Sequence, residues 1–401
     1  MPLGGHGLPV PQCMPTVYGE AGQSRVVSEY QRKGQQMELR RRAFLATMAG
    51  VGVAVAAPGV ARAQGAAAWR KRLTGTDLDT ASRWQVAGTE LGIPYAFANG
   101  SVGYLFGHTF SAARPESGAG WRSPVILKST VHPAAKDGLV FNGAIGLRGN
   151  GLAPAVMHSG QNGLGIDGVW EVAAVPTDGI SFPEDGHQLI SYSSVEHRAP
   201  GPRNSLWKTN YSGLAYSDNG KDFVRTNLKW WNNADNSDPY QLWTMQRDGD
   251  WVYVFSVAAG RQDGGMMLRR VRWDRMLHPA EYEGWGWNGR NWYWNRACTP
   301  ILTGRFGEPS VRRLSDGTWV MSYLNAATNT IVTRTAAGPN CTWSAERAQV
   351  TWAQEPGLYG GFIHPWSSSK PNELHLLVST WRRTLAGRTT AYHVSQYVGT
   401  V

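Results

Sequence analysis

The chain has 401 residues and a formal net charge of +10. Residues 1–63 hold seven Lys or Arg and three Asp or Glu, so the rest of the chain carries +6. This mild charge, spread over scattered basic residues without Lys or Arg runs, argues against a nucleic-acid-binding protein.

Residues 40–63 have the organisation of a bacterial export signal. Three arginines, Arg40 to Arg42, precede Phe-Leu and an apolar stretch that ends in Ala-Arg-Ala at residues 61–63. The paired arginines indicate the twin-arginine route. The apolar stretch is too short for a membrane span, and Gly and Pro interrupt it. We therefore expect cleavage before Gln64, no stable membrane anchor, and a periplasmic, cell-envelope or extracellular protein.

Residues 64–401 read as a single domain, because no Pro/Ser-rich linker divides them. Met37 lies just ahead of the arginines and is a possible true start, which would make residues 1–36 an extension without a motif. We expect the mature protein to be a monomer.

Residues 88–110, GTELGIPYAFANGSVGYLFGHTF, predict two strands joined by a tight Asn99-Gly100 turn. If the turn centres on Asn99, Glu90 lies roughly opposite His108, with side chains about 5 Å apart on one face. Two titratable groups would then share the open end of a hairpin.

The pattern of a polar turn followed by an alternating strand recurs four more times along the chain. The four turns are Asp185-Gly186, Asp248-Gly249, Asp316-Gly317 and Pro371-Asn372. Five such units over about 300 residues indicate a repeated supersecondary element. We predict an all-β, five-bladed β-propeller, with a large β-sandwich as the alternative.

Three further features accompany this pattern. Asp218 and Asp222, in YSDNGKDF, resemble the Asp-box turn of sialidase-type propellers, which is peripheral and structural. Cys298 and Cys341 could stay free thiols or join in an oxidising compartment, and we predict that they form a disulfide. The aromatic run EGWGWNGRNWYWN is either a sugar-binding loop or a packed plug between blades; its candidates for sugar binding are Trp285 and Trp287.

Functional side chains are expected on the innermost strand of each blade, because these strands surround the propeller axis. Acidic residues are costly to bury without a purpose, so several at equivalent inner positions favour a functional site. The structural alternative is that each caps backbone amides or pairs with an arginine such as Arg122 or Arg312. The inner-strand candidates are Glu90, Asp178, Trp243, Glu308 and His364.

From about residue 74 to 398, the chain resembles the domain-of-unknown-function family 4185. The resemblance rests on the motifs GTELGIPY, YLFGHTF, WRSPVILKST, VPTDGI, WKTNYSGLAYSDNG, GEPSV and YGGFIHPW. That family comprises exported five-bladed propellers and includes the glycoside hydrolase family 183 endo-D-arabinanases. The resemblance therefore implies cleavage of D-arabinofuranosyl linkages in polymers such as mycobacterial arabinogalactan or lipoarabinomannan.

The chain departs from the family at two positions. The family reads T-D-L-G and F-G-D-T, and these two aspartates look like its acid and base pair. In this chain the first is Glu90, which keeps the carboxylate, and the second is His108, which does not. An imidazole can still transfer a proton near neutral pH, but the change could equally mark lost activity. Asp178 or Glu308 could then supply the second carboxylate.

Two functions remain open: a secreted glycoside hydrolase acting on furanose-rich polysaccharide, and a carbohydrate-binding propeller that has lost hydrolysis. The sequence requires no cofactor and shows no compact metal-ligand motif, although a metal held near His108 and His364 is a further alternative. The predicted catalytic residues are Glu90, His108, Asp178 and Glu308. The predicted substrate-binding residues are Trp121, Arg122, Trp243, Trp285, Trp287 and His364.

Overall fold

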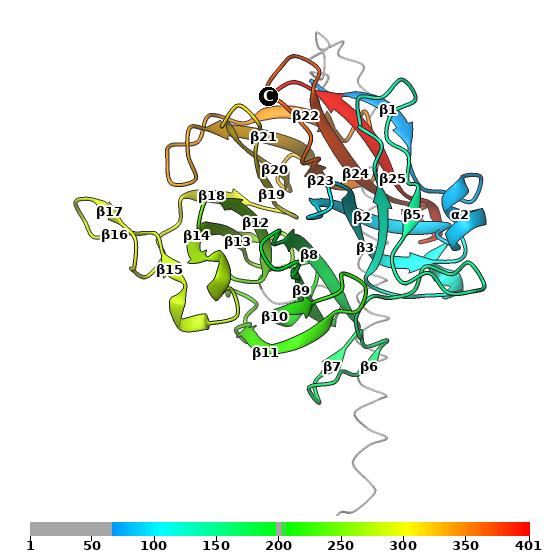
Figure 1. Cartoon of the computed structure of the whole chain (residues 1–401), viewed down its shortest axis with the longest axis horizontal. Helices are drawn as coiled ribbons and strands as arrows, with labels where there is room; N and C mark the ends of the chain where they lie inside the picture. Colours follow the sequence, from blue (N-terminus) through cyan, green and yellow to red (C-terminus); the bar gives the residue numbers. More distant parts are fainter. Residues whose placement is uncertain (1–65, 198–202, 204) are drawn as a thin grey trace, which may run out of the picture. The chain divides into compact units, whose positions relative to one another are not determined.

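The computed structural model describes residues 66–197, 203 and 205–401, and over these ranges it is a five-bladed β-propeller (Figure 1). The predicted fold class is confirmed. The expected export signal lies outside the described residues, and so does the alternative start at Met37.

Each blade is an antiparallel sheet, and its strands follow one another from the propeller axis outward. The first blade has, from the innermost strand, β2 (Gly88–Ala96), β3 (Val102–Phe110), β4 (Val125–Ser129) and β5 (Gly143–Ala144). The second has β8 (Ala173–Ser181), β9 (Gln188–His197), β10 (Lys208–Ser217) and β11 (Val224–Trp231). The third has β12 (Leu242–Asp248), β13 (Trp251–Val257), β14 (Asp263–Arg272) and β15 (Glu283–Gly284), with β18 (Leu302–Arg305) also paired to β14.

The fourth blade has β19 (Ser310–Arg313), β20 (Trp319–Asn325), β21 (Thr330–Ala336) and β22 (Arg347–Thr351). The fifth has β23 (Leu358–Ile363), β24 (Leu374–Arg383), β25 (Thr389–Gly399) and β1 (Ala68–Arg72). Two small hairpins, β6–β7 (Gly163–Leu164 and Trp170–Glu171) and β16–β17 (Gly286–Trp287 and Trp292–Tyr293), extend outside the blades. The helices are α2 (Asp79–Trp84) and three 3₁₀ turns at Pro115–Ser117, Trp273–Arg275 and Pro279–Glu281. No helix within the described ranges is long and apolar enough to cross a membrane.

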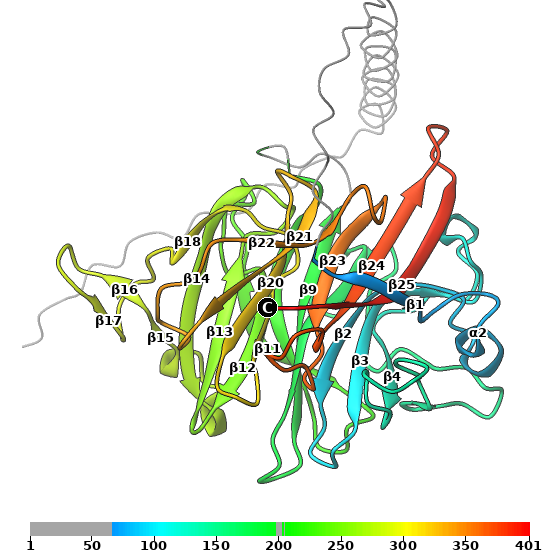
Figure 2. The same cartoon turned by 90° about the horizontal axis from the view of Figure 1, so that it is seen from above.

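The innermost strands β2, β8, β12, β19 and β23 form a closed ring, each in contact with the next (Figures 1 and 2). The propeller is closed within the fifth blade by its outer strands. There β1, from the start of the described chain, pairs with β25, near its end. The two ends of the propeller are thus held in one sheet.

Alternation along the strands fills the spaces between blades. In β13, Val252 and Val254 pack into one hydrophobic cluster, whereas Phe255 and Val257 pack into the next. Because successive side chains of a strand point to opposite faces, both faces of this blade are buried against neighbours. A sandwich would bury one face of each sheet, so this two-sided burial belongs to the propeller.

The predicted first hairpin is confirmed. β2 and β3 are joined by a turn in which Gly100 has φ of +80° and the Ser101 N–H bonds to Asn99 Oδ1. The other four predicted turns likewise join the two inner strands of their blades. The stretch with Asp218 and Asp222 forms the outer turn between β10 and β11, away from the axis, as expected.

The predicted disulfide is wrong. Cys298 and Cys341 are both free thiols. Cys298 is half-buried and donates its S–H to the Leu268 carbonyl oxygen, 3.3 Å away, whereas Cys341 is exposed in the loop after β21. An even number of cysteines permitted a bridge, but the two residues have separate environments.

Candidate functional site

The candidate site lies at the end of the propeller where the innermost strands begin. Glu90 is the third residue of β2, Tyr359 the second of β23, and Glu308 comes two residues before β19. Because β3 runs antiparallel to β2, His108 near its end reaches the same site. Arg261, in the β13–β14 turn, completes what we call the carboxylate cluster: Glu90, His108, Arg261, Glu308 and Tyr359.

Glu90 is held by donors from two blades. Its Oε2 accepts a hydrogen bond of 2.7 Å from the Tyr359 hydroxyl, and its Oε1 accepts one of 3.1 Å from the His108 backbone N–H. The His108 Nδ1 lies 3.2 Å from the same Oε1. The Glu90 side chain is 13% exposed and that of His108 only 4%. Glu90 therefore faces outward, while His108 lies behind it.

An irregular backbone positions this carboxylate. The pairing register between β2 and β3 changes on both sides of Leu91, whose backbone φ is +68°. This bulge frees the Leu91 N–H to donate to Ser379 Oγ at 2.9 Å. A Cβ at Gly107 would stand 2.9 Å from Glu90 Oε1, so a side chain there would displace the carboxylate. Bulges of this kind commonly re-aim a side chain at a functional site.

Glu308 is paired with Arg261. The Arg261 Nη2 donates to Glu308 Oε1 at 2.5 Å, and Nε lies 3.2 Å from both carboxylate oxygens. The guanidinium is held between two aromatic rings, 5.0 Å from the Trp207 centroid and 5.0 Å from that of Tyr359. Such stacking favours a guanidinium over an ammonium group.

The cluster is electrostatically coupled. Burial raises the pKa of Glu308, and the charge of Glu90 adds to this effect, while Arg261 opposes it. Burial and the charges of Glu90 and Glu308 hold the pKa of Tyr359 well above its ordinary value, so its hydroxyl remains a donor to Glu90. The pKa of Glu308 is thus raised by burial, whereas Glu90 accepts hydrogen bonds from the Tyr359 hydroxyl and the His108 backbone N–H.

Aromatic side chains flank the cluster. Trp121 is half-buried in the loop after β3, with its ring edge-on to that of His108 at 5.8 Å. Trp207, just before β10, is half-buried and stacks on Arg261. Both tryptophans offer apolar faces next to hydrogen-bonding groups, an arrangement suited to sugar rings.

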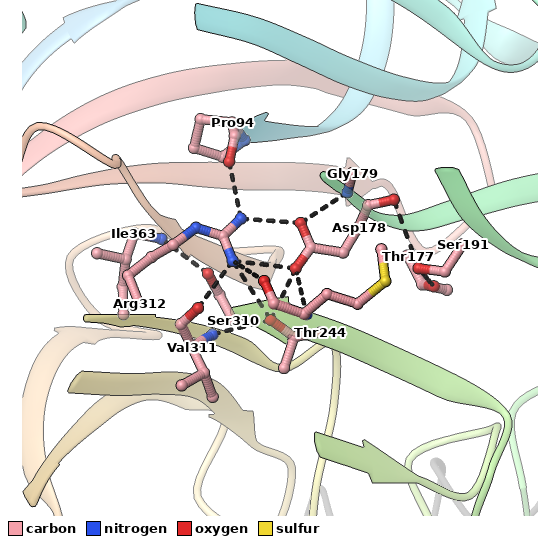
Figure 3. A network of polar contacts seen from close by, with 11 residues as sticks. Pro94, Thr177, Asp178, Gly179, Ser191, Thr244, Ser310, Val311, Arg312 and Ile363 are labelled. Carbon is pink, nitrogen blue, oxygen red and sulfur yellow. Dashed lines mark hydrogen bonds and ion pairs between the residues drawn. The ribbon is translucent and has the colours of Figure 1, made fainter. Parts of the chain in front are cut away.

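Asp178 lies outside this site, in a buried ion pair, so the structure does not support its predicted catalytic role. The residue is 1% exposed, and its carboxylate forms a two-point ion pair with Arg312 (Figure 3). It also accepts hydrogen bonds from the Gly179 N–H, the Met245 N–H and the Thr244 hydroxyl. Both carboxylate oxygens are therefore fully hydrogen-bonded inside the protein. The alternative stated above, that this acidic residue pairs with an arginine such as Arg312, describes its environment.

Three predicted substrate-binding residues are structural as well. Arg122 is 6% exposed and donates to four backbone carbonyls, and burial lowers its pKa to about 10. Trp243 is 1% exposed, and its Nε1 donates to the Tyr240 carbonyl. His364 is fully buried, with Nε2 2.8 Å from the Tyr104 hydroxyl and Nδ1 accepting the Trp366 N–H. All three side chains are buried and hydrogen-bonded within the protein.

Trp285 and Trp287 belong to the loop that carries β16–β17, beyond the outermost strand of the third blade. They are exposed or half-buried but contribute nothing to the carboxylate cluster. Of the predicted site residues, the structure therefore brings together Glu90, His108 and Glu308, with Trp121 at their side. In the described parts of the chain, no three His, Cys, Asp or Glu residues are grouped so as to hold a metal ion.

Sequence reasoning missed Tyr359, Arg261 and Trp207. Tyr359 and Trp207 lie in the motifs YGGFIHPW and WKTNYSGLAYSDNG, so the motifs themselves were a signal. Arg261 lies in a turn, AGRQDGG, whose sequence gives no indication of a role.

Comparisons with known proteins agree with this fold. Residues 75–398 match the family described as Domain of unknown function (DUF4185). A relative from Aspergillus versicolor, named Notoamide biosynthesis cluster protein J', is 52% identical over 83% of this chain and 92% of that one.

Solved structures are similar at much lower identity. A Bacteroides ovatus protein described as a proposed hydrolase shares 14% identity, with a TM-score of 0.51 over 84% of this chain and 86% of that one. At this identity the likeness shows the fold alone. An α-L-arabinofuranosidase from Podospora anserina, in complex with cellotriose, has 11% identity and a TM-score of 0.45, over 84% of this chain and 98% of that one.

Proposed function

The chain belongs to the DUF4185 family, and on that premise we propose that it is a glycoside hydrolase acting on furanose-rich polysaccharide, most closely as an endo-D-arabinanase. The observation that carries the proposal is that two partly exposed carboxylates, Glu90 and Glu308, are electrostatically coupled and have different partners. Glycoside hydrolases typically need one carboxyl group that donates a proton and one that is charged.

We assign the proton donor to Glu308. Burial raises its pKa, and its side chain is 14% exposed, so a protonated carboxyl can reach a glycosidic oxygen. When the proton has moved to the leaving group, the Arg261 guanidinium stabilises the carboxylate that remains. Glu308 thereby resembles catalytic carboxylic acids whose pKa is raised by burial.

We assign the charged carboxylate to Glu90. Donors from Tyr359 and the His108 backbone favour its ionised form, in which it acts on the anomeric carbon directly or through water. His108 is 4% exposed, so it acts through Glu90 as a positioning residue. This differs from the sequence-based expectation that the imidazole itself transfers the proton.

The experiment is incubation of the mature protein with purified mycobacterial arabinan, followed by chromatography of the released oligosaccharides. We expect arabino-oligosaccharides from the wild type and at least about 10²-fold slower release from Glu90→Gln and Glu308→Gln, the scale of losing a general acid or base. Asp316→Asn, at an exposed turn, is the matched control. Wild-type rates in both Gln variants would remove these residues from catalysis.

The second candidate is a carbohydrate-binding propeller without hydrolysis. It is favoured by His108 in place of the family's aspartate and by the ion pair that occupies Glu308. Saturable arabinan binding without any product between pH 4 and 8 would select it.

A further inference from the structure

The third blade carries an aromatic hairpin that the proposed active site does not use. It is formed by β16 and β17, and it projects beyond β15 away from the propeller body (Figures 1 and 2). The returning chain fixes its base: a Cβ at Gly286 would stand 2.2 Å from the Ala297 carbonyl oxygen, so the hairpin fits only with glycine there. The hairpin is therefore held in one place on the blade.

Its register gathers four tryptophans on one face. Trp287 pairs with Trp292 across the hairpin, and strand alternation puts Trp285 and Trp294 on the same face as this pair. We call these four residues the tryptophan strip. Consecutive rings along it, from base to tip, have centroid distances of 4.9 Å (Trp294–Trp285), 5.9 Å (Trp285–Trp292) and 5.8 Å (Trp292–Trp287).

The strip is anchored at its base and open at its tip. Trp294 packs against Tyr253, and the Arg270 guanidinium lies between the rings of Trp294 and Trp251, at 4.3 and 4.0 Å. Trp287, at the tip, is 45% exposed. Trp287 does not stand alone but continues the row of ring contacts through Trp292, and contiguous apolar patches rimmed by polar residues mark interaction sites. Of the two alternatives predicted for this aromatic run, packing against the blades therefore describes only the base of the strip.

The hairpin segment is polar, and the acidic group next to its base, Glu283, is paired with Arg270. Residues 285–307 contain Arg290, Arg296 and Arg305 but no Asp or Glu. Arg290, in the turn between Trp287 and Trp292, is exposed, and the Arg296 guanidinium lies over the Tyr293 ring at 5.9 Å. The Asn288 side-chain oxygen shapes the tip by accepting two backbone N–H bonds. Apolar ring faces beside exposed guanidinium donors suit ligands that have C–H faces and many oxygen acceptors.

We propose that the tryptophan strip is an accessory binding site for a polysaccharide chain, separate from the carboxylate cluster and independent of whether that cluster hydrolyses. A protein partner fits it poorly. All four tryptophans are less than half exposed, and a tryptophan offers at most about 250 Å², whereas a stable protein interface needs roughly 800 Å² per partner. The rings follow one another at 4.9, 5.9 and 5.8 Å with neighbouring planes inclined by 49°, 13° and 55°, so they offer a bent row of apolar faces to successive rings of one sugar chain.

The test is affinity gel electrophoresis of the full mature protein in gels containing arabinogalactan, arabinoxylan or carboxymethylcellulose. The variants are Trp287→Ala and the double variant Trp287→Ala/Trp292→Ala, with Trp287→Tyr as the conservative replacement. Trp352→Ala is the matched control, because Trp352 is 47% exposed on another blade. Thermal unfolding and size-exclusion chromatography verify folding and association state.

We expect at least one polymer to retard the wild type, and the double variant to lose at least about tenfold in affinity while Trp287→Tyr and Trp352→Ala keep it. Retardation by carboxymethylcellulose alone assigns the site to anionic chains. Hydrolysis of a short arabinofuranoside, if present, stays within twofold of wild type in every variant, which separates this site from the proposed catalytic one. The proposal is overturned if no gel retards the wild type, or if the double variant binds as well as the wild type. It is also overturned if the wild type is a dimer and the double variant is a monomer.

Discussion

The Asp178 carboxylate and the Arg312 guanidinium form a two-point ion pair, with an Oδ1–Nη2 distance of 2.8 Å and an Oδ2–Nη1 distance of 3.0 Å. The pair joins β8 to β19, and it also contacts the strand between them through Thr244 and Met245. Arg312 reaches the first blade as well, by donating to the Pro94 carbonyl (Figure 3). One ion pair thus ties four innermost strands together.

Asp178→Asn is therefore expected to destabilise the fold by about 3–5 kcal/mol, because it leaves a buried guanidinium without its counter-charge. Urea denaturation measures the loss. Adding Arg312→Met should recover part of it, because the unpaired charge is then removed. The activity per folded molecule should stay within a few fold of wild type; a loss of 10²-fold in a folded variant would return Asp178 to the catalytic residues.

The pairing of Arg261 with Glu308 predicts a shift in pH dependence. If Glu308 is the proton donor, the rate falls as pH rises through its raised pKa. Arg261 lowers that pKa, so Arg261→Met should raise it further and move the basic limb of the pH–rate profile to higher pH. Arg261→Lys should shift the limb less. A basic limb that does not move in either variant contradicts the assignment of Glu308.

His108→Asp restores the residue that the family carries at this position. The backbone N–H that donates to Glu90 is retained, so we expect activity within about tenfold of wild type. Two adjacent carboxylates disfavour double ionisation, so the acid limb of the kcat/KM profile should move to higher pH. His108→Asn, which adds no charge, should show a smaller shift. Movement of the limb to lower pH would indicate that the imidazole itself titrates in catalysis.

Buried histidines predict acid sensitivity of the fold. Burial lowers the pKa of His364 well below its ordinary value and those of His375 and His393 to about 4. The unfolded chain binds these protons from about pH 6.5, so the free energy of unfolding should fall as pH drops from there toward about 4. The expected slope is about 1.4 kcal/mol per pH unit for each histidine. Denaturant titrations at pH 7, 6 and 5 measure it, and His375→Gln should reduce the slope; a flat profile contradicts the prediction.

We propose that the chain is exported by the twin-arginine route and cleaved after Ala63. Replacing both Arg41 and Arg42 with Lys keeps the charge but removes the pair that this route reads. The double variant should accumulate uncleaved inside the cell, as judged by fractionation and N-terminal sequencing. Arg25→Lys, outside the signal, is the control. Normal export of the double variant would leave the route unsupported.

The sequence predicts those features that depend on neighbours close in the chain. The contact of Glu90 with His108 follows from the register of one hairpin, and the five blades follow from repeated turns. The role of Asp178 could not be decided in this way, because its partner lies 134 residues away and only the packed ring brings the two together. Its inner-strand position was predicted correctly, but not its burial.

The same reason explains why Tyr359 was missed. It lies 269 residues from Glu90 and reaches it from a different blade. Arg261 and Glu308 are 47 residues apart on loops of two blades, and neither sequence neighbourhood indicates the other. The tryptophans of β16–β17 were recognised as a candidate sugar-binding surface from their local pattern, but only the fold shows that this surface lies outside the blades.

The pairing of β1 with β25 has a consequence for the order in which the protein can be made. Ala68 is paired with Val398, so the first strand of the domain waits for a partner from the last blade to be synthesised. Contacts over such a separation form slowly and late. Closure of the fifth blade therefore cannot precede synthesis of β25, and a nascent or truncated chain that stops before β25 exposes the unpaired edge of β24, a site for aggregation.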